Sequence, residues 1–241
     1  MKSRKNSQRD TGDGIEADNA GWSFDVPGNR FDEHIARSVP FYREGHDLIA
    51  RLSDFFLIEN SVVYDIGSTT GSLVKAILAR HPNREMSITG IERVPSMVEY
   101  AADQVEDPRA SFVNADALDY EFGQAHLFIL YYTLQFIHPS VRIDLLKTIY
   151  ERLHWGGGLL MFEKVRAPDA RFQDYMSQVY KEYKLANDFT AEQILNKEQS
   201  LKGTLEPFSE AGNLTLLRES GFRDITSVFK WVCFEGFLAI K

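Results

Sequence analysis

The stretch VVYDIGSTTGS, residues 62–72, decides the fold of this chain. An apolar run carries Asp65 near its end, turns at Gly67 and crosses small residues to Gly71, after which residues 73–78 have helical spacing. A strand that enters a helix through a glycine turn exposes backbone N–H groups at the carboxyl end of the strand, where a cofactor can lie against them. The stretch therefore predicts a strand–turn–helix unit that binds a cofactor.

A second acidic residue follows the next apolar run. Residues 87–91, SITGI, lead to Glu92, about 25 residues after Gly67. An acid at the tip of a second strand can accept two hydrogen bonds from a ribose diol, so the two strand ends favour a nucleoside site over a plain turn. The loop lacks the third glycine of a dinucleotide site, which favours S-adenosyl-L-methionine (SAM) and leaves NAD open. The cofactor-binding residues predicted here are Asp65, Gly67, Ser68, Gly71, Glu92 and Arg93.

Strand and helix segments alternate through the middle of the chain. The predicted strands are residues 62–66, 87–91, 110–113, 127–131 and 159–162, and the predicted helices are residues 73–81, 97–105, 141–153 and 214–220. Strands without in/out alternation, separated by helix-length segments, indicate a parallel sheet covered on both faces. Residues 225–230 and 232–240 lack a helix-length spacer and should form an antiparallel hairpin. We predict an α/β, doubly wound, mostly parallel seven-stranded sheet of the Rossmann-like class I methyltransferase type.

The chain should form one domain with additions at two places. Residues 1–20 are polar and are predicted to be a flexible arm, so the domain spans residues 21–241. Apolar residues recur at helical spacing from residue 31 to 57, with a bend expected at Pro40. Residues 154–158, HWGGG, are expected to end the preceding helix as a glycine stop. A helical insertion is predicted at about residues 170–204.

Composition excludes several classes of protein. The net charge of −8 argues against a surface that coats nucleic acid. A single cysteine, Cys233, excludes a disulfide framework. No apolar run approaches the length of a membrane span and no secretory signal begins the chain, so a cytoplasmic location is expected. The histidines are scattered without ligand spacing, so no metal site is predicted.

Further candidate residues follow later strands. Asp116 can bind an adenine amino group, with the backbone of Ala117 assisting, or it can be an ordinary loop or N-cap aspartate. Tyr131 and Tyr132 follow the fourth strand, where their rings can stack on a sulfonium or a substrate, or can be core aromatics. The dipeptide at residues 163–164, Glu-Lys, is expected to be an exposed ion pair.

Several strings resemble the carboxy-S-adenosyl-L-methionine synthase family. They are FDEHIARSVPFY at 31–42, YDIG at 64–67, TLQFIHPS at 133–140, FEK at 162–164 and AN at 186–187. The resemblance implies a class I methyltransferase fold, a homodimer, and conversion of SAM and prephenate to carboxy-SAM for wobble-uridine modification in tRNA. It also implies that the cofactor is held by Tyr42, Gly67, Glu92, Asp116 and Ala117, with Arg37 nearby.

Two positions depart from the family pattern. Where the family has an arginine that grips the extra carboxylate of carboxy-SAM, this chain has Glu198. A carboxylate repels the group that a guanidinium would bind, unless Lys197 or Lys202 replaces the arginine. The family's asparagine at the tip of the fourth strand is Tyr131 here.

Three functions remain open. The first is a SAM-dependent methyltransferase related to carboxy-SAM synthase, acting on a small-molecule or nucleotide acceptor. The alternatives are carboxy-SAM synthase itself and a non-catalytic SAM-binding protein. The candidate catalytic residues are Tyr131, Tyr132 and Glu198. A homodimer is expected, and direct binding of nucleic acid or a membrane is not.

Overall fold

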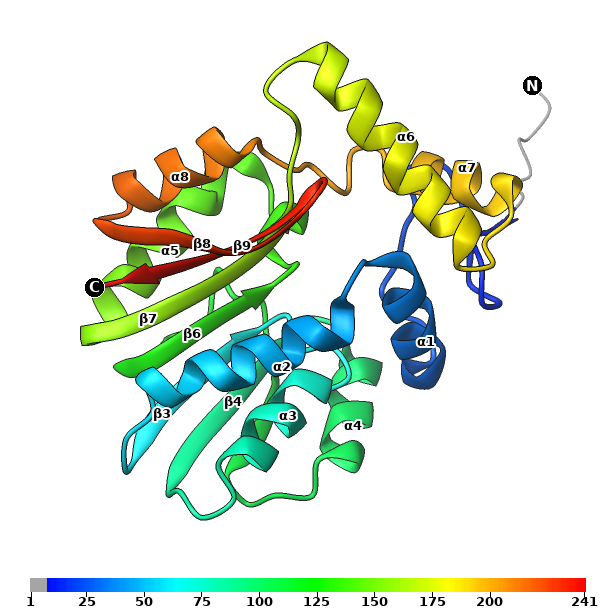
Figure 1. Ribbon diagram of the computed structural model, residues 1–241. Coiled ribbons are helices and arrows are strands. Elements are labelled where there is room, and N and C mark those ends of the chain that lie inside the picture. Colours follow the sequence, from blue (N-terminus) through cyan, green and yellow to red (C-terminus); the bar gives the residue numbers. More distant parts are fainter. Residues whose placement is uncertain (1–7) are drawn as a thin grey trace.

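A seven-stranded sheet forms the centre of the protein in the computed structural model, which describes residues 8–241 (Figure 1). Its strands are β3 (Ser61–Ile66), β4 (Met86–Glu92), β5 (Ala110–Asn114), β6 (Ala125–Tyr131), β7 (Leu153–Lys164), β8 (Asp224–Trp231) and β9 (Phe234–Ile240). They lie in the order β5-β4-β3-β6-β7-β9-β8. The first five strands along this order pair in parallel, and β9 pairs antiparallel with both β7 and β8. The predicted doubly wound sheet with a terminal hairpin is confirmed.

Helices cover both faces of this sheet. On one side lie α2 (Tyr42–Leu52), α3 (Ser72–Arg80) and α4 (Pro95–Gln104), and on the other lie α5 (Pro139–Arg152) and α8 (Glu210–Glu219) (Figure 1). Beyond the end of the sheet lie α1 (Gly28–Ser38), α6 (Ala170–Ala186) and α7 (Ala191–Ser200). The segments η1 (Ser53–Phe55) and η2 (Leu134–Phe136) are short 3₁₀ helices. Among residues 8–241, no helix combines the length and apolar character that crossing a bilayer demands.

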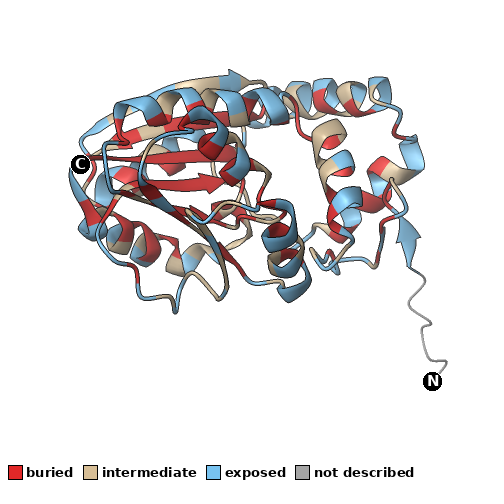
Figure 2. Cartoon of the chain, turned by 90° about the horizontal axis from the view of Figure 1, so that it is seen from below, coloured by how far each residue is buried: buried red, intermediate tan, exposed pale blue. Residues whose placement is uncertain are grey.

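Successive strand residues supply two separate apolar layers. In β3, Val63 packs in the layer that contains α2 and α3, whereas Tyr64 packs in the layer that contains α5 and α8. In β6, Ile129 and Leu130 divide in the same way. Buried residues accordingly fill the sheet between helices whose outer faces are exposed (Figure 2). Because both faces are covered, these strands are apolar throughout rather than alternating.

The order of the strands fixes where a ligand can bind. The chain runs from β3 outward to β4 and β5, then returns to β6 on the other side of β3. In such a sheet the crevice opens at the carboxyl ends of the strands on either side of this switch point. The segments that follow β3, β4, β5 and β6 therefore meet at one edge, which α1, α6 and α7 cover.

The prediction of a flexible arm up to residue 20 is wrong from residue 8 onward, whereas residues 1–7 lie outside the described residues. Two short strands, β1 (Arg9–Asp10) and β2 (Glu16–Ala17), pair as an antiparallel ribbon. Ile15 and Trp22 are buried in a small cluster that packs on Leu201. Backbone hydrogen bonds from residues 20 and 22 to the end of α7 fix the segment further. Composition alone predicted a flexible arm, because the residues that hold this segment in place lie about 180 positions further along the chain.

The predicted glycine stop at residues 154–158 is also wrong. Helix α5 ends at Arg152 because Leu153 turns to an extended conformation, and the glycines belong to β7. A Cβ on Gly158 would lie 2.8 Å from the ring of Phe56, so glycine lets this ring pack against the strand. The predicted bend before Pro40 is present, because Val39 is extended between α1 and α2.

Candidate functional site

A cavity of about 610 Å³ lies at the carboxyl ends of the parallel strands. Its walls come from the segments after β3, β4, β5 and β6, from α1 and α2, and from α6 and α7. Residues 22–24 of the N-terminal segment also line it. The volume suits a nucleoside-sized cofactor together with part of a second small molecule.

The loop after β3 brings bare backbone to the cavity. Gly67 has a φ of +78°, and a Cβ there would lie 2.5 Å from Oγ1 of Thr133. The Thr133 hydroxyl donates to the carbonyl of Ile66 at 2.8 Å, which fixes the neighbouring wall. Gly71 has a φ of +75° and caps α3, but it does not line the cavity. Gly67 and Ser68 therefore line the cavity, whereas Gly71 shapes the turn.

Asp65 and Glu92 lie at adjacent strand tips and line the cavity. Asp65 is 2% exposed, and burial, with a smaller contribution from Glu92, raises its pKa to about 7. Glu92 is 8% exposed, and burial raises its pKa. Its two oxygens accept the N–H groups of Thr69 at 3.2 Å and Val94 at 2.9 Å. These bonds orient the carboxylate and leave it further lone pairs for a ligand.

Residues after β5 form the next part of the wall. Asp116 and Ala117 both line the cavity. The Asp116 carboxylate accepts the N–H of Leu118 at 3.0 Å, as in an Asx turn. Its other oxygen lies 3.6 Å from the guanidinium of Arg93, whose side chain is largely exposed. Asp116 is therefore an ordinary loop aspartate that also lies where it can contact a ligand in the cavity.

Three tyrosines form an aromatic wall beside the glycine loop. The ring of Tyr42 lies 5.1 Å from that of Tyr131, which lies 4.6 Å from that of Tyr132. The Tyr131 hydroxyl donates to the carbonyl of Tyr42 at 2.7 Å, so it holds α2 against β6. Tyr132 has a φ of +60° and lines the cavity. Of the two candidates, Tyr131 is the one whose hydroxyl is engaged by the backbone of α2.

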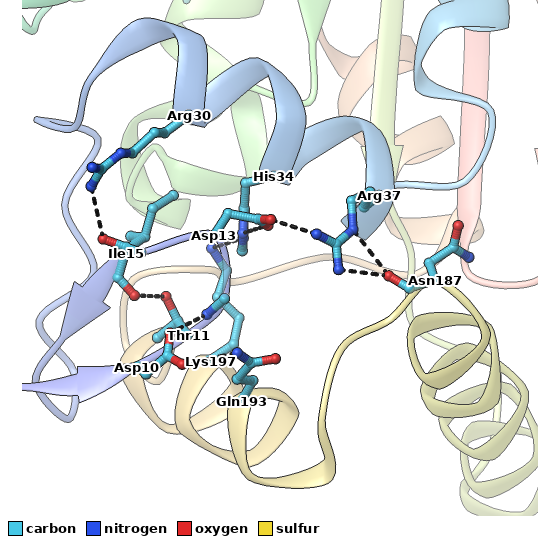
Figure 3. Close-up of polar contacts among 12 residues, drawn as sticks. Asp10, Thr11, Asp13, Ile15, Arg30, His34, Arg37, Asn187, Gln193 and Lys197 are labelled. Atoms are coloured by element: carbon cyan, nitrogen blue, oxygen red, sulfur yellow. Dashed lines mark hydrogen bonds and ion pairs between the residues drawn. The ribbon is translucent and has the colours of Figure 1, made fainter.

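Arg37 does not line the cavity. Its guanidinium pairs with Asp13 and donates to the carbonyl of Asn187 at 3.0 and 2.9 Å (Figure 3). Asp13 also lies 3.0 Å from Nδ1 of His34, whose Nε2 lies 3.1 Å from Nζ of Lys197. Arg37 thus joins the N-terminal ribbon to α1 and to the end of α6, and its contact with the cofactor stays a prediction.

The structure corrects the sequence interpretation of residues 163 and 164. Glu163 is fully buried, and burial raises its pKa to about 8. Lys164 turns into the cavity, with its Nζ over the ring of Tyr180. The two side chains form no exposed ion pair, because alternate residues of a strand point to opposite faces.

The position of Glu198 is on the cavity wall, where its carboxylate lies 3.6 Å from Nζ of Lys181. Lys197 lines the cavity as well, whereas Lys202 is exposed and does not. Lys184 was not predicted from the sequence, although it faces the same space. A lysine in a long polar helix gives no sequence signal of burial, so only the packing of α6 reveals it.

The residues present fit a nucleoside cofactor with an amino-acid end. One oxygen of Asp65 and the hydroxyl of Ser68 are buried without a hydrogen-bond partner among the described residues. Such orphaned groups are costly unless a ligand satisfies them. Glu92 offers acceptors to a diol, and Gly67 offers close approach to backbone. Within residues 8–241, no group of three potential metal ligands occurs.

Comparisons with known proteins agree with this geometry. Residues 63–157 match the family model described as a methyltransferase domain. Carboxy-S-adenosyl-L-methionine synthase of Staphylococcus epidermidis is 35% identical over 222 residues, which cover 91% of this chain and 97% of that protein. The protein of the same name from Campylobacter lari is 32% identical, over 88% of this chain and 90% of its own.

Solved structures show the same fold at lower identity. Human N-acetylserotonin methyltransferase in complex with SAM has a TM-score of 0.61 and 21% identity, covering 89% of this chain but spanning only 55% of that protein. The plantazolicin methyltransferase BpumL in complex with SAH has a TM-score of 0.64 and 13% identity, covering 90% of this chain and 91% of that one.

Proposed function

The chain belongs to the carboxy-S-adenosyl-L-methionine synthase family, and on that premise we propose that it transfers a methyl group from ordinary SAM to a small-molecule or nucleotide acceptor. The protein is an enzyme of the SAM-dependent class with a class I methyltransferase fold. The acceptor and the choice between SAM and carboxy-SAM belong to the proposal.

The observation that carries the choice of ordinary SAM is the carboxylate of Glu198 on the cavity wall. In the family pattern an arginine occupies this position and binds the extra carboxylate of carboxy-SAM. Glu198 presents a like charge there, and Lys181 neutralises it only through a partly exposed pair at 3.6 Å. An exposed pair of this kind is weak, so Glu198 disfavours a second carboxylate nearby.

Different residues of the cavity would bind different parts of SAM. Glu92 would accept the ribose hydroxyls, Asp116 and Ala117 would contact the adenine, and Asp65 would accept the amino group of the methionine end. When bound, SAM supplies an electrophilic methyl group on a sulfonium. The protein then contributes position, because it holds the acceptor in line with that methyl group. Tyr132, which lines the cavity, would orient the acceptor through its hydroxyl group.

Carboxy-SAM synthase is the second candidate. The names of the relatives favour it, as do three cavity-lining lysines, Lys164, Lys184 and Lys197, that offer positive charge in a cavity that lacks the arginine. In this case the chain would take SAM and prephenate and would serve wobble-uridine modification of tRNA. A non-catalytic SAM-binding protein is the third candidate.

We further propose a homodimer in the cytoplasm, without direct binding of nucleic acid. Helix α6 exposes Phe172, Tyr175 and Val179, which recur at helical spacing on one face. An exposed apolar stripe on a long helix suits contact with a second copy of the chain.

Mass spectrometry of ligands released from the purified protein, and of its products after incubation with SAM and prephenate, tests the proposal. We expect SAM or its demethylated product SAH in the released fraction and no carboxy-SAM from the incubation. Formation of carboxy-SAM would replace the first candidate with the second. Protein that releases only SAM and consumes none of it would favour the non-catalytic candidate.

A further inference from the structure

Three lysines from different elements reach the cavity. Lys164 comes from the end of β7, Lys184 from α6 and Lys197 from α7. The last two are 5% and 8% exposed. A buried ammonium group is costly unless hydrogen bonds or an opposite charge compensate it, so each lysine requires a partner.

Lys197 has its partners within the protein. Its Nζ lies over the ring of Trp22 and 3.1 Å from Nε2 of His34. His34 in turn contacts Asp13 (Figure 3). These contacts join α7 to α1 and to the N-terminal ribbon. Lys197 is therefore a structural element of the cavity wall.

Lys164 and Lys184 have no such partners. Their Nζ atoms lie 4.5 and 4.4 Å from the centroid of the same ring, that of Tyr180. Within residues 8–241, neither ammonium group has a hydrogen bond or an ion pair. The Tyr180 hydroxyl donates to the carbonyl of Ser38 at 2.8 Å, which fixes the ring and with it the two ammonium groups. A ring face compensates a cation only in part.

The two charges also repel each other. Burial, with a smaller contribution from the charge of Lys164, lowers the pKa of Lys184 to about 7. The nearest acid on the wall is Glu198, which already pairs with Lys181. A ligand carboxylate between the two amino groups would favour the charged form of both, so this stretch of wall forms a site for an anionic ligand.

The location of the pair separates it from the nucleoside end. Lys164 ends β7, whereas the cofactor loop follows β3, and β6 lies between these two strands. Glu92 and Asp116 lie farther still, at the tips of β4 and β5. The lysines therefore face the part of the cavity that an adenosine bound at Glu92 leaves open.

We propose that Lys164 and Lys184 form a subsite that binds the carboxylate of a small-molecule ligand beside the cofactor. This inference rests on the proposed function for the adjacent SAM site. The carboxylate has two sources, an acidic acceptor or the extra carboxyl group of carboxy-SAM. In either case the lysines replace the single arginine of the family with two ammonium groups on a different wall.

Isothermal titration calorimetry with three ligands tests the subsite. SAM is titrated first, then carboxy-SAM, and then prephenate into protein saturated with SAM, for the wild type and for Lys164→Gln and Lys184→Gln. We expect each substitution to weaken the binding of the carboxylate ligand about tenfold or more and to change the affinity for SAM less than about twofold. If only the binding of carboxy-SAM is weakened, the carboxylate at the subsite belongs to the cofactor. If only the binding of prephenate is weakened, the carboxylate belongs to the acceptor.

Controls keep the outcome specific. Lys184→Arg preserves the charge and should retain binding, and Lys147→Gln removes an exposed lysine of α5 and should change nothing. Wild-type protein that binds neither carboxylate, or glutamine variants that bind both as the wild type does, overturn the subsite. Wild-type protein that fails to bind SAM overturns the proposed function instead, so the two failures are distinguishable.

Discussion

Replacement of Glu92 by glutamine should weaken SAM binding about 10- to 150-fold. In the structure Glu92 lines the cavity, its two oxygens accept the N–H groups of Thr69 and Val94, and each oxygen has a further lone pair for a ligand. Glutamine retains one oxygen and places an NH₂ group where the second acceptor was, so at least one bond to the ribose diol is lost. A hydrogen bond to a charged acceptor contributes about 1.5–3 kcal/mol, which gives this range in Kd.

Calorimetric titration of SAM into the wild type and the variant measures this loss. Glu99→Gln is the matched control, because it makes the same change of charge at an exposed position of α4 and should bind SAM as the wild type does. Thermal unfolding of each protein without ligand shows whether the fold is intact. Wild-type affinity in a folded Glu92→Gln protein would refute the assignment of Glu92 to the ribose.

Three further predictions concern the cavity and the assembly. Burial raises the pKa of Asp65 to about 7 in the folded state, compared with 3.8 in the unfolded chain, so the folded state binds this proton more tightly. The resulting contribution to the free energy of unfolding is fully present below pH 3.8 and is lost as the pH rises through 7, by up to about 4 kcal/mol. Urea unfolding across this range should show a smaller decline in Asp65→Asn, and an equal decline would contradict the cause. Gly67→Ala should lower the free energy of unfolding by about 1–3 kcal/mol in the same assay, because the residue has positive φ and an added Cβ would clash with the side chain of Thr133. An unchanged urea midpoint would contradict this explanation. Light scattering should give twice 27.6 kDa for the wild type and the monomer mass for Val179→Asp, whereas a monomeric wild type would exclude the dimer.

Much of the fold could be predicted because its signals are local. The apolar runs at residues 62–66 and 127–131 identify β3 and β6 to within two residues at each end. Their lack of alternation indicates burial on both faces, which in turn predicts the parallel order. The acid at the tip of each of two strands likewise predicts that Asp65 and Glu92 meet at one edge, as the structure shows.

The errors arose where distant contacts override local composition. Residues 1–20 were predicted to be a flexible arm, yet Ile15 is buried in a cluster with Trp22 that packs on Leu201. The glycines at 156–158 were predicted to stop a helix, yet they belong to β7, where Gly158 lets the ring of Phe56 pack against the strand. The lysine pair of the cavity was missed for the same reason, because only the crossing of α6 over the end of β7 brings Lys184 beside Lys164.

The ratio of the dissociation constants of SAM and carboxy-SAM, measured by calorimetry on the same wild-type protein, tests the central claim most directly. If Glu198 sets the choice of cofactor, SAM should bind at least as tightly as carboxy-SAM, and Glu198→Arg should move the ratio about 10- to 150-fold towards carboxy-SAM. Wild-type protein that binds carboxy-SAM more than about tenfold tighter than SAM would contradict the account and identify the chain as a carboxy-SAM synthase.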